Sequence, residues 1–483
     1  MNTTPLHFTD FYKVGHVFQY PEGTERVYSN LTPRASRIPG VDKVVFFGLQ
    51  HFLRGMGDQL DGMFFNRPKH EVVDLYRRRT EAALGPLPSY EHIANLHNLG
   101  YFPLKVKALP EGTLVPLRVP CATLINTHPE FAWVTNFIEG WLSCNIWQPC
   151  TSATIAHQYR LSLDRYAKLT GMDPGFVDYQ AHDFSFRGMG CLQAAISSGM
   201  GHLLSFRGTD TMVANDYLVD SYYATDSDLG VSVPATEHSV MCAGGDENED
   251  ETYRRLIEDI YPSGIVSIVS DTWDLWRVLT VTLLKLKEKI LARNGKLVIR
   301  PDSGDPGLIL CGDPDSPDPN VRKGVVELLW DVFGGTLTST GHRLLDPHIG
   351  AIYGDSITLA RQDEICRRLM EKGYASQCVL GIGSYTYQYN TRDTFSFAVK
   401  STAVVIGGKL WPIFKKPKTD DGTKNSLRGL IWVGEEGGQI IARDGVSWDE
   451  EAQGLLRTVW QDSTFRRQEN IRDIRARLRA ARP

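Results

Sequence analysis

The sequence predicts an α/β protein with a parallel sheet or barrel in the middle of the chain and a mostly β domain built from both chain ends. In the central part, short apolar runs alternate with amphipathic helical segments, and each apolar run ends in charged or glycine-rich residues. Such runs are typical of strands buried on both faces. In the flanking parts, short strand-like runs alternate with glycine and proline turns. We therefore expect a barrel domain over residues 146–395 and a β-rich domain over 1–145 and 396–483.

The most readable element is a strand–helix–strand unit. Residues 265–270 (IVSIVS) predict a strand, and residues 274–293 predict an amphipathic helix that Asn294 and Gly295 close. Residues 296–300 (KLVIR) predict the next strand. This is a βαβ unit, in which the two strands run parallel.

A second unit of the same kind follows. Residues 349–353 (IGAIY) predict a strand, 359–372 a helix and 378–382 (CVLGI) another strand. The carboxyl ends of parallel strands meet on one rim, where α/β barrels hold their catalytic groups. Residues at or just beyond the predicted strand ends are therefore expected on one rim: Arg187, Asp210, Asp271, Arg300, Asp302, Asp355 and Gly383.

The flanking parts contain strand-like runs at 402–406 and 430–433, each followed by glycine. The polar stretch 415–428 (KKPKTDDGTKNSLR) predicts a surface loop. The net charge is −5, and no basic block is long enough to indicate nucleic-acid binding.

Cysteine usage and the N-terminus indicate a cytoplasmic protein. The eight cysteines are scattered without a C-x-x-C pair, which favours reduced thiols. The N-terminal MNTTPLHFTDFYK has no basic region followed by an apolar run, so no signal peptide is expected. No apolar stretch reaches the roughly 18 residues of a membrane-spanning helix. The motifs of P-loop proteins, dinucleotide-binding dehydrogenases, zinc proteases and serine hydrolases are absent as well.

Several rim residues have the chemistry of a ribose-phosphate site, although each also has a structural interpretation. Arg300 and Asp302 can form a structural ion pair, or can bind an oxygen and ribose hydroxyls respectively. Gly354 and Gly383 can make plain turns, or can let backbone N–H groups approach a phosphate. Phe184 can belong to the core or can stack on a flat heterocycle.

A histidine between two carboxylates is open to three interpretations. His238 follows Glu237 directly, and Asp271 ends a predicted strand nearby in the fold. The histidine can act as a general base, can accept a phosphate, or can pack in the core.

Taken in order, these segments resemble the nicotinamide phosphoribosyltransferase family. Any one of them is weak, but the ordered set is specific and spans most of the chain. The matching segments are TDFYKVGH (9–16), QYPEGTERVYS (19–29), HDFSFRG (182–188), FRGTDT (206–211), SVPATEHS (232–239), IVSDTWD (268–274), IRPDSGDP (299–306), YGDSI (353–357) and TRDTF (391–395).

The resemblance implies a type II phosphoribosyltransferase, with an irregular α/β barrel and a β-rich second domain, that works as a homodimer with active sites at the interface. Such an enzyme transfers the phosphoribosyl group of phosphoribosyl pyrophosphate to nicotinamide, forming nicotinamide mononucleotide and pyrophosphate in NAD salvage. Nicotinamide would lie between Phe184 and Tyr12 of the partner subunit. Asp210 would accept a hydrogen bond from the carboxamide NH₂, and Arg300 would donate to its oxygen.

The resemblance also implies how the rest of the substrate is held. Asp302 would bind ribose hydroxyls, and Mg²⁺ would accompany the pyrophosphate. ATP would be an optional co-substrate that phosphorylates His238 beside Glu237 and Asp271. The ribose and phosphate contacts would come from Arg187, Gly354, Asp355 and Gly383, and from the partner's Arg34, Arg392, Lys400, Lys415 and Lys424.

The sequence departs from the family at two of these places. Gly383 is followed by Ser384 instead of a longer glycine run, which alters the expected 5′-phosphate contacts. Ala398 stands where the family commonly has a hydroxyl, which removes one phosphate contact.

Three alternative functions remain open. Nicotinate is the closest alternative substrate, but an ionised Asp210 would repel its carboxylate and would pair with an amide. A non-catalytic nucleotide-binding protein would not need Asp210, Arg300, Asp302 and His238 together. A sugar-phosphate aldolase would need a lysine at a strand end, and the sequence shows none.

Overall fold

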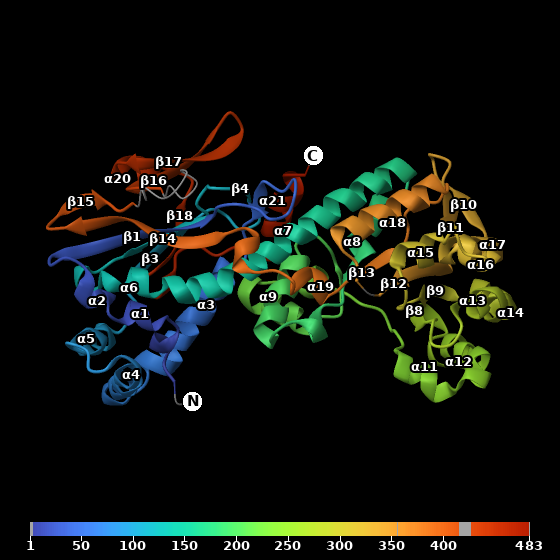
Figure 1. Ribbon diagram of the computed structural model, residues 1–483, viewed down its shortest axis with the longest axis horizontal. Coiled ribbons are helices and arrows are strands. Elements are labelled where there is room, and N and C mark those ends of the chain that lie inside the picture. The colour runs from blue at the N-terminus through green and yellow to red at the C-terminus, as the bar shows by residue number, and fades with distance from the viewer. Residues whose placement is uncertain (1–2, 355, 415–426, 483) are drawn as a thin grey trace. The chain divides into compact units, whose positions relative to one another are not determined.

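The computed structural model describes residues 3–354, 356–414 and 427–482, and the chain forms two compact units. We name each unit after its main sheet, and Figure 1 labels the elements. The β-rich unit comprises Met1–Thr154, Tyr217–Ala224 and Asn390–Pro483, and the barrel unit comprises Ile155–Asp216 and Thr225–Tyr389.

The barrel unit is built around a six-stranded sheet in which all neighbouring strands are parallel. The predicted strands at 265–270, 296–300, 349–353 and 378–382 are confirmed to within a few residues. The order across the sheet is β7 (Gly208–Thr209), β6 (Ala181–Asp183), β13 (Val379–Ile382), β12 (Ile349–Tyr353), β9 (Asn294–Arg300) and β8 (Ser263–Val269).

An extended segment, residues 231–236, joins the two edges of this sheet, and we call it the closing segment. At one end, the Val231 carbonyl accepts from Thr209 N–H at 3.0 Å. At the other end, Ser267 N–H donates to the Pro234 carbonyl at 2.9 Å, and Thr236 N–H donates to the Ser267 carbonyl at 3.0 Å. Because this segment takes the place of a regular strand, the sheet curls into an irregular α/β barrel.

The helix predicted at 274–293 is present, but it is interrupted. It begins as α13 (Leu275–Arg277), passes through one wide turn, η9 (Val278–Thr282), and continues as α14 (Leu283–Ala292). The helix ends at Ala292, next to the predicted end at 293, but Asn294 and Gly295 do not cap it, because both residues begin β9. A Cβ on Gly295 would lie 2.0 Å from the Gly264 carbonyl oxygen, so this glycine permits a close approach of β8 and β9.

Other helices of the barrel unit pack alongside the parallel strands (Figure 1). The second predicted helix is confirmed as α18 (Leu359–Glu371), which packs against α15 (Pro306–Cys311). Helix α17 (Val325–Phe333) packs against β12 and α15. The buried face of α18 contains Ile365, Cys366 and Leu369, at the three- to four-residue spacing of a core-facing helix.

The β-rich unit is confirmed as a product of both chain ends. Its sheet has seven strands, all paired antiparallel. Three N-terminal strands lie side by side in the middle, and a pair of C-terminal strands flanks them on each side. The order is β15 (Lys409–Pro412), β14 (Phe397–Ile406), β1 (Thr24–Pro33), β5 (Ala122–Asn126), β3 (Leu104–Ala108), β18 (Arg457–Gln461) and β19 (Thr464–Phe465). A separate hairpin, β16 (Leu430–Glu436) and β17 (Gln439–Val446), contains the other predicted strand.

A short segment from the middle of the chain belongs to the β-rich unit. Residues Tyr217–Ala224 contain Tyr222, whose hydroxyl donates to the buried carboxylate of Glu111 at 2.9 Å. Glu111 also accepts from the N–H groups of Gly48 at 2.7 Å and Gln50 at 2.6 Å. One carboxylate therefore connects three parts of the chain that are distant in sequence.

The described residues, with gaps at 355 and 415–426, include no helix that is long and apolar enough to cross a membrane.

Candidate active site

The carboxyl ends of the parallel strands carry the predicted rim residues, as expected for one rim of the barrel. Each strand of the sheet, and the closing segment, contributes one or two of these residues. Phe184 follows β6, Asp210 follows β7, Glu237 and His238 follow the closing segment, Asp271 follows β8, Arg300 and Asp302 lie at the end of β9, Gly354 follows β12 and Gly383 follows β13.

Asp210 is held by two donors on the same oxygen. Its Oδ1 lies 2.9 Å from His182 Nε2 and accepts from Ser232 Oγ at 2.5 Å. Partial burial opposes ionisation, but the hydrogen bonds of His182 and Ser232 and the charge of Arg300 together lower the pKa of Asp210. The carboxylate is therefore ionised at neutral pH. The Asp210 side chain is 44% exposed. Its second oxygen, Oδ2, can therefore accept a hydrogen bond from a ligand.

Phe184 and Arg300 form a flat surface next to Asp210. The Arg300 guanidinium lies over the Phe184 ring, 5.3 Å from the ring centre, at a distance typical of cation–π contacts. A Cβ on Gly381 of β13 would lie 2.5 Å from Phe184 Cδ2, so the ring packs directly on this glycine. Arg300 Nε is buried and has no hydrogen-bond partner among the described residues. An unpaired donor of this kind suits a polar ligand.

A second cluster connects β8, β9 and the histidine after the closing segment. His238 Nε2 lies 3.3 Å from Asp271 Oδ1, and Asp302 N–H donates to Asp271 Oδ2 at 2.7 Å. Asp302 Oδ2 lies 4.0 Å from Arg300 Nη2. A Cβ on Gly354 would lie 2.5 Å from Asp302 Oδ1, so a larger residue at position 354 would clash with the Asp302 carboxylate. Asp271 thus orients both His238 and the loop that begins at Asp302.

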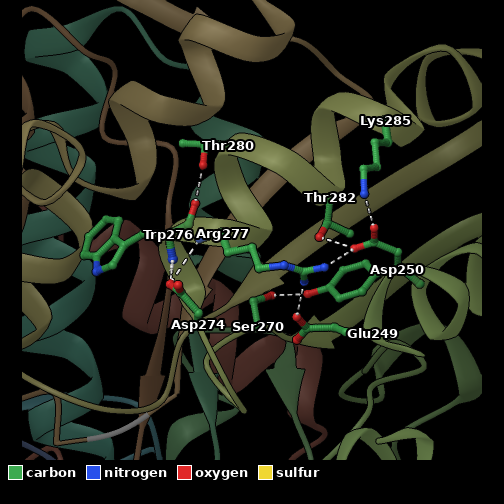
Figure 2. A network of polar contacts seen from close by, with 10 residues as sticks. Glu249, Asp250, Ser270, Asp274, Trp276, Arg277, Thr280, Thr282 and Lys285 are labelled. Carbon is green, nitrogen blue, oxygen red and sulfur yellow. Dashed lines mark hydrogen bonds and ion pairs between the residues drawn. The ribbon is translucent and has the colours of Figure 1, made fainter. Parts of the chain in front are cut away.

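A polar network supports the loop after β8, which carries Asp271 (Figure 2). Arg277 pairs with Glu249 at 3.1 Å and with Asp250 at 3.2 Å. Asp274 caps α13 by accepting from the N–H groups of Trp276 and Arg277. Burial raises the pKa of Glu249 to about 7, and the charge of Arg277 opposes this rise. The network fixes the Asp274 end of the loop, three residues after Asp271.

Other predicted residues on this rim are placed less tightly. The Glu237 carboxylate accepts from the hydroxyl of Ser239, which lies in the adjoining helix α11 (His238–Gly244). Arg187 is exposed on the short turn η5 (Phe186–Gly188). Gly383 is the N-cap residue of α19 (Ser384–Tyr387), and there is open space at the position that a Cβ would take. Asp355, Lys415 and Lys424, which are also predicted to contact the ribose or the phosphates, lie outside the described residues.

The β-rich unit gathers the residues assigned to the partner subunit. An open hollow of about 340 Å³, which we call the cationic hollow, contains four of these predicted residues, Tyr12, Arg34, Arg392 and Lys400. Tyr12 is 64% exposed. The other lining residues are Asp10, Lys13, Glu139, Gly140, Ser143, Cys144, Trp147, Ala398 and Val399. The lining contains four cationic side chains and two carboxylates, and this excess of positive charge suits a polyphosphate. The cations are Lys13, Arg34, Arg392 and Lys400, and the carboxylates are Asp10 and Glu139.

Sequence reasoning missed four residues that the structure places in these clusters: His182, Ser232, Lys13 and Glu139. A signal for the first existed, because His182 and Phe184 are two residues apart at the end of a strand and so share a face. No comparable signal existed for Lys13 and Glu139, which are 126 residues apart.

The described part of the chain contains no group of three or more His, Cys, Asp or Glu side chains that could hold a metal ion by itself. This donor set fits Mg²⁺ bound mainly by substrate phosphates, because such sites need only one or two carboxylates. Asp302, 18% exposed on the rim, is a carboxylate of this kind.

Residues 179–464 match the nicotinate phosphoribosyltransferase (NAPRTase) family, and residues 5–106 match the N-terminal domain of nicotinamide phosphoribosyltransferase. A protein of Acinetobacter baylyi named nicotinamide phosphoribosyltransferase is 51% identical, with 98% of this chain and 97% of its own length aligned. A protein of the same name from Mycoplasma pneumoniae is 34% identical, with 87% and 93% aligned.

Two solved structures share the fold at low sequence identity. Nicotinate-nucleotide pyrophosphorylase from Pyrococcus furiosus aligns with a TM-score of 0.57 at 15% identity, over 98% of this chain and 94% of that one. Human nicotinic acid phosphoribosyltransferase aligns with a TM-score of 0.55 at 17% identity, over 98% and 93%. Both alignments cover the barrel and the β-rich unit, and they support the fold assignment.

Proposed function

Because the chain belongs to the nicotinate phosphoribosyltransferase family, we propose that it transfers the phosphoribosyl group of phosphoribosyl pyrophosphate to nicotinamide. The products would be nicotinamide mononucleotide and pyrophosphate, in NAD salvage. The relatives from Acinetobacter baylyi and Mycoplasma pneumoniae bear the name of this activity.

The observation that supports nicotinamide most directly is the state of Asp210. One oxygen is already occupied by His182 and Ser232, and the carboxylate is ionised. Oδ2 would accept a hydrogen bond from the carboxamide NH₂, while Arg300 Nε, which has no other partner among the described residues, would donate to the carboxamide oxygen. A carboxylate on the substrate would face the like charge of Asp210, which disfavours binding of nicotinate.

The pyridine ring would stack on Phe184, next to the Arg300 guanidinium. Tyr12 of the partner subunit would cover the second face of the ring. In a homodimer of this kind, the cationic hollow of one subunit would complete the rim of the other.

The ribose and phosphates would extend along the rim. Asp302 would accept from the ribose hydroxyls, next to Gly354. Arg187, Asp355 and Gly383 would surround the 5′-phosphate. The leaving pyrophosphate would be bound by residues of the partner subunit: Arg34, Arg392, Lys400, Lys415 and Lys424.

Catalysis would consist of positioning and charge stabilisation. The bond from ribose C1 to the pyrophosphate oxygen breaks while the pyridine nitrogen attacks C1, so positive charge develops on the ribose and negative charge on the leaving group. Asp302, close to the ribose, would favour the positive charge. The arginines and lysines of the hollow would favour the negative charge, and Mg²⁺ bound to the pyrophosphate would add to this stabilisation. No protein nucleophile is required.

We also propose that ATP stimulates the reaction by phosphorylating His238. The geometry that supports this proposal is the contact between His238 and Asp271, with 45% of the histidine side chain exposed. Asp271 would orient the ring, so that the exposed nitrogen could accept a phosphoryl group. Since all eight cysteines are free, we further propose a reducing, cytoplasmic location.

The proposal is tested by product formation from phosphoribosyl pyrophosphate and Mg²⁺ with either nicotinamide or nicotinate, each with and without ATP. We expect turnover with nicotinamide, and loss of the preference in Asp210→Ala. Equal turnover of nicotinate by the wild type would establish the alternative function, nicotinate phosphoribosyl transfer. A rate that ATP leaves unchanged, and that His238→Ala also leaves unchanged, would refute the role of ATP.

A further inference from the structure

A buried ion pair lies at the edge of the cationic hollow, and the proposed chemistry does not use it. Lys13 Nζ donates to Glu139 Oε2 at 2.8 Å, and the two side chains are only 6% and 10% exposed. A buried ion pair adds little to stability compared with apolar residues of the same size. Its location therefore calls for another explanation.

Each partner of the pair is connected to a residue that faces the hollow. Lys13 follows Tyr12 in α1 (Phe11–Val14), and its ammonium lies 5.4 Å from the centre of the Tyr12 ring. It also donates to the Asn136 carbonyl at 3.0 Å, so α1 is attached to α6 (Trp133–Phe137). The exposed Tyr12 ring thus belongs to a helix of four residues, and the buried Lys13 ammonium attaches this helix to α6.

Glu139 extends the connection to the sheet. Its Oε1 accepts from Ser29 Oγ of β1 at 3.1 Å and from Ser401 Oγ of β14 at 3.3 Å. The two serine hydroxyls are also 2.8 Å apart. Ser401 directly follows Lys400, the proposed pyrophosphate ligand. One carboxylate therefore links the helix under Tyr12 to the strand that carries Lys400.

We propose that Lys13 and Glu139 are positioning residues, which set Tyr12 and Lys400 at a fixed spacing in the cationic hollow. This inference rests on the proposed function. Through Tyr12 the pair acts on nicotinamide in the partner's site, and through Lys400 it acts on the pyrophosphate end of the other substrate. A displacement of about 1 Å in groups of this kind costs up to about 100-fold in rate.

The chain offers a matched control pair in the same unit. Lys107 of β3 binds Glu451 of α20 (Trp448–Gln453), also at 2.8 Å, with side chains 14% and 6% exposed. This pair has the same chemistry and similar burial, and neither residue lines the cationic hollow. Effects that arise only from breaking a buried ion pair should therefore appear equally in both pairs.

The experiment compares Lys13→Met and Glu139→Gln with Lys107→Met and Glu451→Gln. We expect all four to lower the unfolding temperature, but only the first two to raise the KM of nicotinamide or of phosphoribosyl pyrophosphate by about tenfold or more. Lys13→Arg, which keeps the charge, should recover most of the loss. Equal activity losses in both pairs at equal unfolding temperature would show a purely structural role and would overturn the proposal.

Two further measurements keep the test decisive. If the ion-pair variants do not fold, Ser401→Ala removes a single neutral donor, and the proposal then requires a raised KM for phosphoribosyl pyrophosphate at an unchanged unfolding temperature. If the wild type does not convert nicotinamide, the proposed function fails. The affinity of each full-length variant for magnesium pyrophosphate, measured by calorimetry, still decides the positioning role, because an affinity equal to that of the wild type refutes it.

Discussion

Replacing Gly381 by alanine should damage nicotinamide binding in a way that can be worked out from the packing around it. A Cβ at this position would lie 2.5 Å from Phe184 Cδ2 and 3.0 Å from both Phe184 Cε2 and the Tyr353 carbonyl oxygen. Carbon atoms pack at about 3.5–4.0 Å. Because the Tyr353 carbonyl belongs to the backbone of β12, the Phe184 ring must retreat, by about 1 Å.

That displacement shifts the ring away from the position on which nicotinamide is proposed to stack, and it alters the contact with Arg300. A shift of about 1 Å in a positioned group costs up to about 100-fold in kcat/KM, or about 2.7 kcal/mol. The loss should appear in the KM of nicotinamide, while the KM of phosphoribosyl pyrophosphate should change less than about threefold, since its proposed contacts lie elsewhere on the rim.

The assay is steady-state kinetics with both substrates varied, supported by a thermal melt. Gly350→Ala is the matched control, because Gly350 lies in β12 of the same sheet and its Cβ would meet only side-chain atoms that can give way or are at ordinary contact distance, Lys296 Cδ at 3.3 Å and Val298 Cγ2 at 3.9 Å. We expect this control to keep wild-type kinetics. A folded Gly381→Ala variant with wild-type KM for nicotinamide would refute the placement of the base on Phe184.

Three further outcomes are expected. Ser232→Ala removes a donor from Asp210, so the preference for nicotinamide over nicotinate, measured as a ratio of kcat/KM, should fall about threefold or more; an unchanged ratio contradicts the assigned geometry. Magnesium pyrophosphate should slow alkylation of the exposed Cys144 in the cationic hollow, as read by peptide mass spectrometry, and Arg34→Gln should abolish this protection. Burial raises the pKa of Glu111 to about 7 against the hydrogen bonds of Gln50 and Gly48. Its contribution to stability is therefore complete below about pH 4.5 and is lost as the pH rises through about 7, at most about 3 kcal/mol. Urea unfolding at pH 5 and pH 8 should show this loss in the wild type and a smaller one in Glu111→Gln.

The sequence predicted the parallel strands and their rim because continuous apolar runs are a local signal. Arg300 and Asp302 could be identified as rim residues from the run that precedes them, and the structure places them at the end of β9. A β-rich domain built from both chain ends was also expected. The register of β1 with β14, in which Asn30 pairs with Lys400, depends on contacts across more than 300 residues and has no local signal.

Other features were hidden for physical reasons. The closing segment contains Pro234 and mostly exposed residues, so its composition indicates a loop, although both of its ends form hydrogen bonds with strands. The Gly295 interpretation failed because a glycine after a helix usually stops it, whereas here the glycine permits close contact with Gly264 of the neighbouring strand. The assigned roles of the rim and hollow residues stay predictions until they are tested by mutation.

The length of the closing segment also limits the distance between the Asp210 cluster and the His238 cluster, which it connects. Its first residues bring Ser232 to Asp210, and its last residues lead into His238 beside Asp271. Six extended residues span about 20 Å at about 3.3 Å per residue, so the length of the segment limits how far apart the two clusters can lie. Removing one residue would turn every side chain after the deletion to the opposite face. Natural variants of this protein should therefore tolerate insertions and deletions in surface loops, but none between Val231 and Thr236.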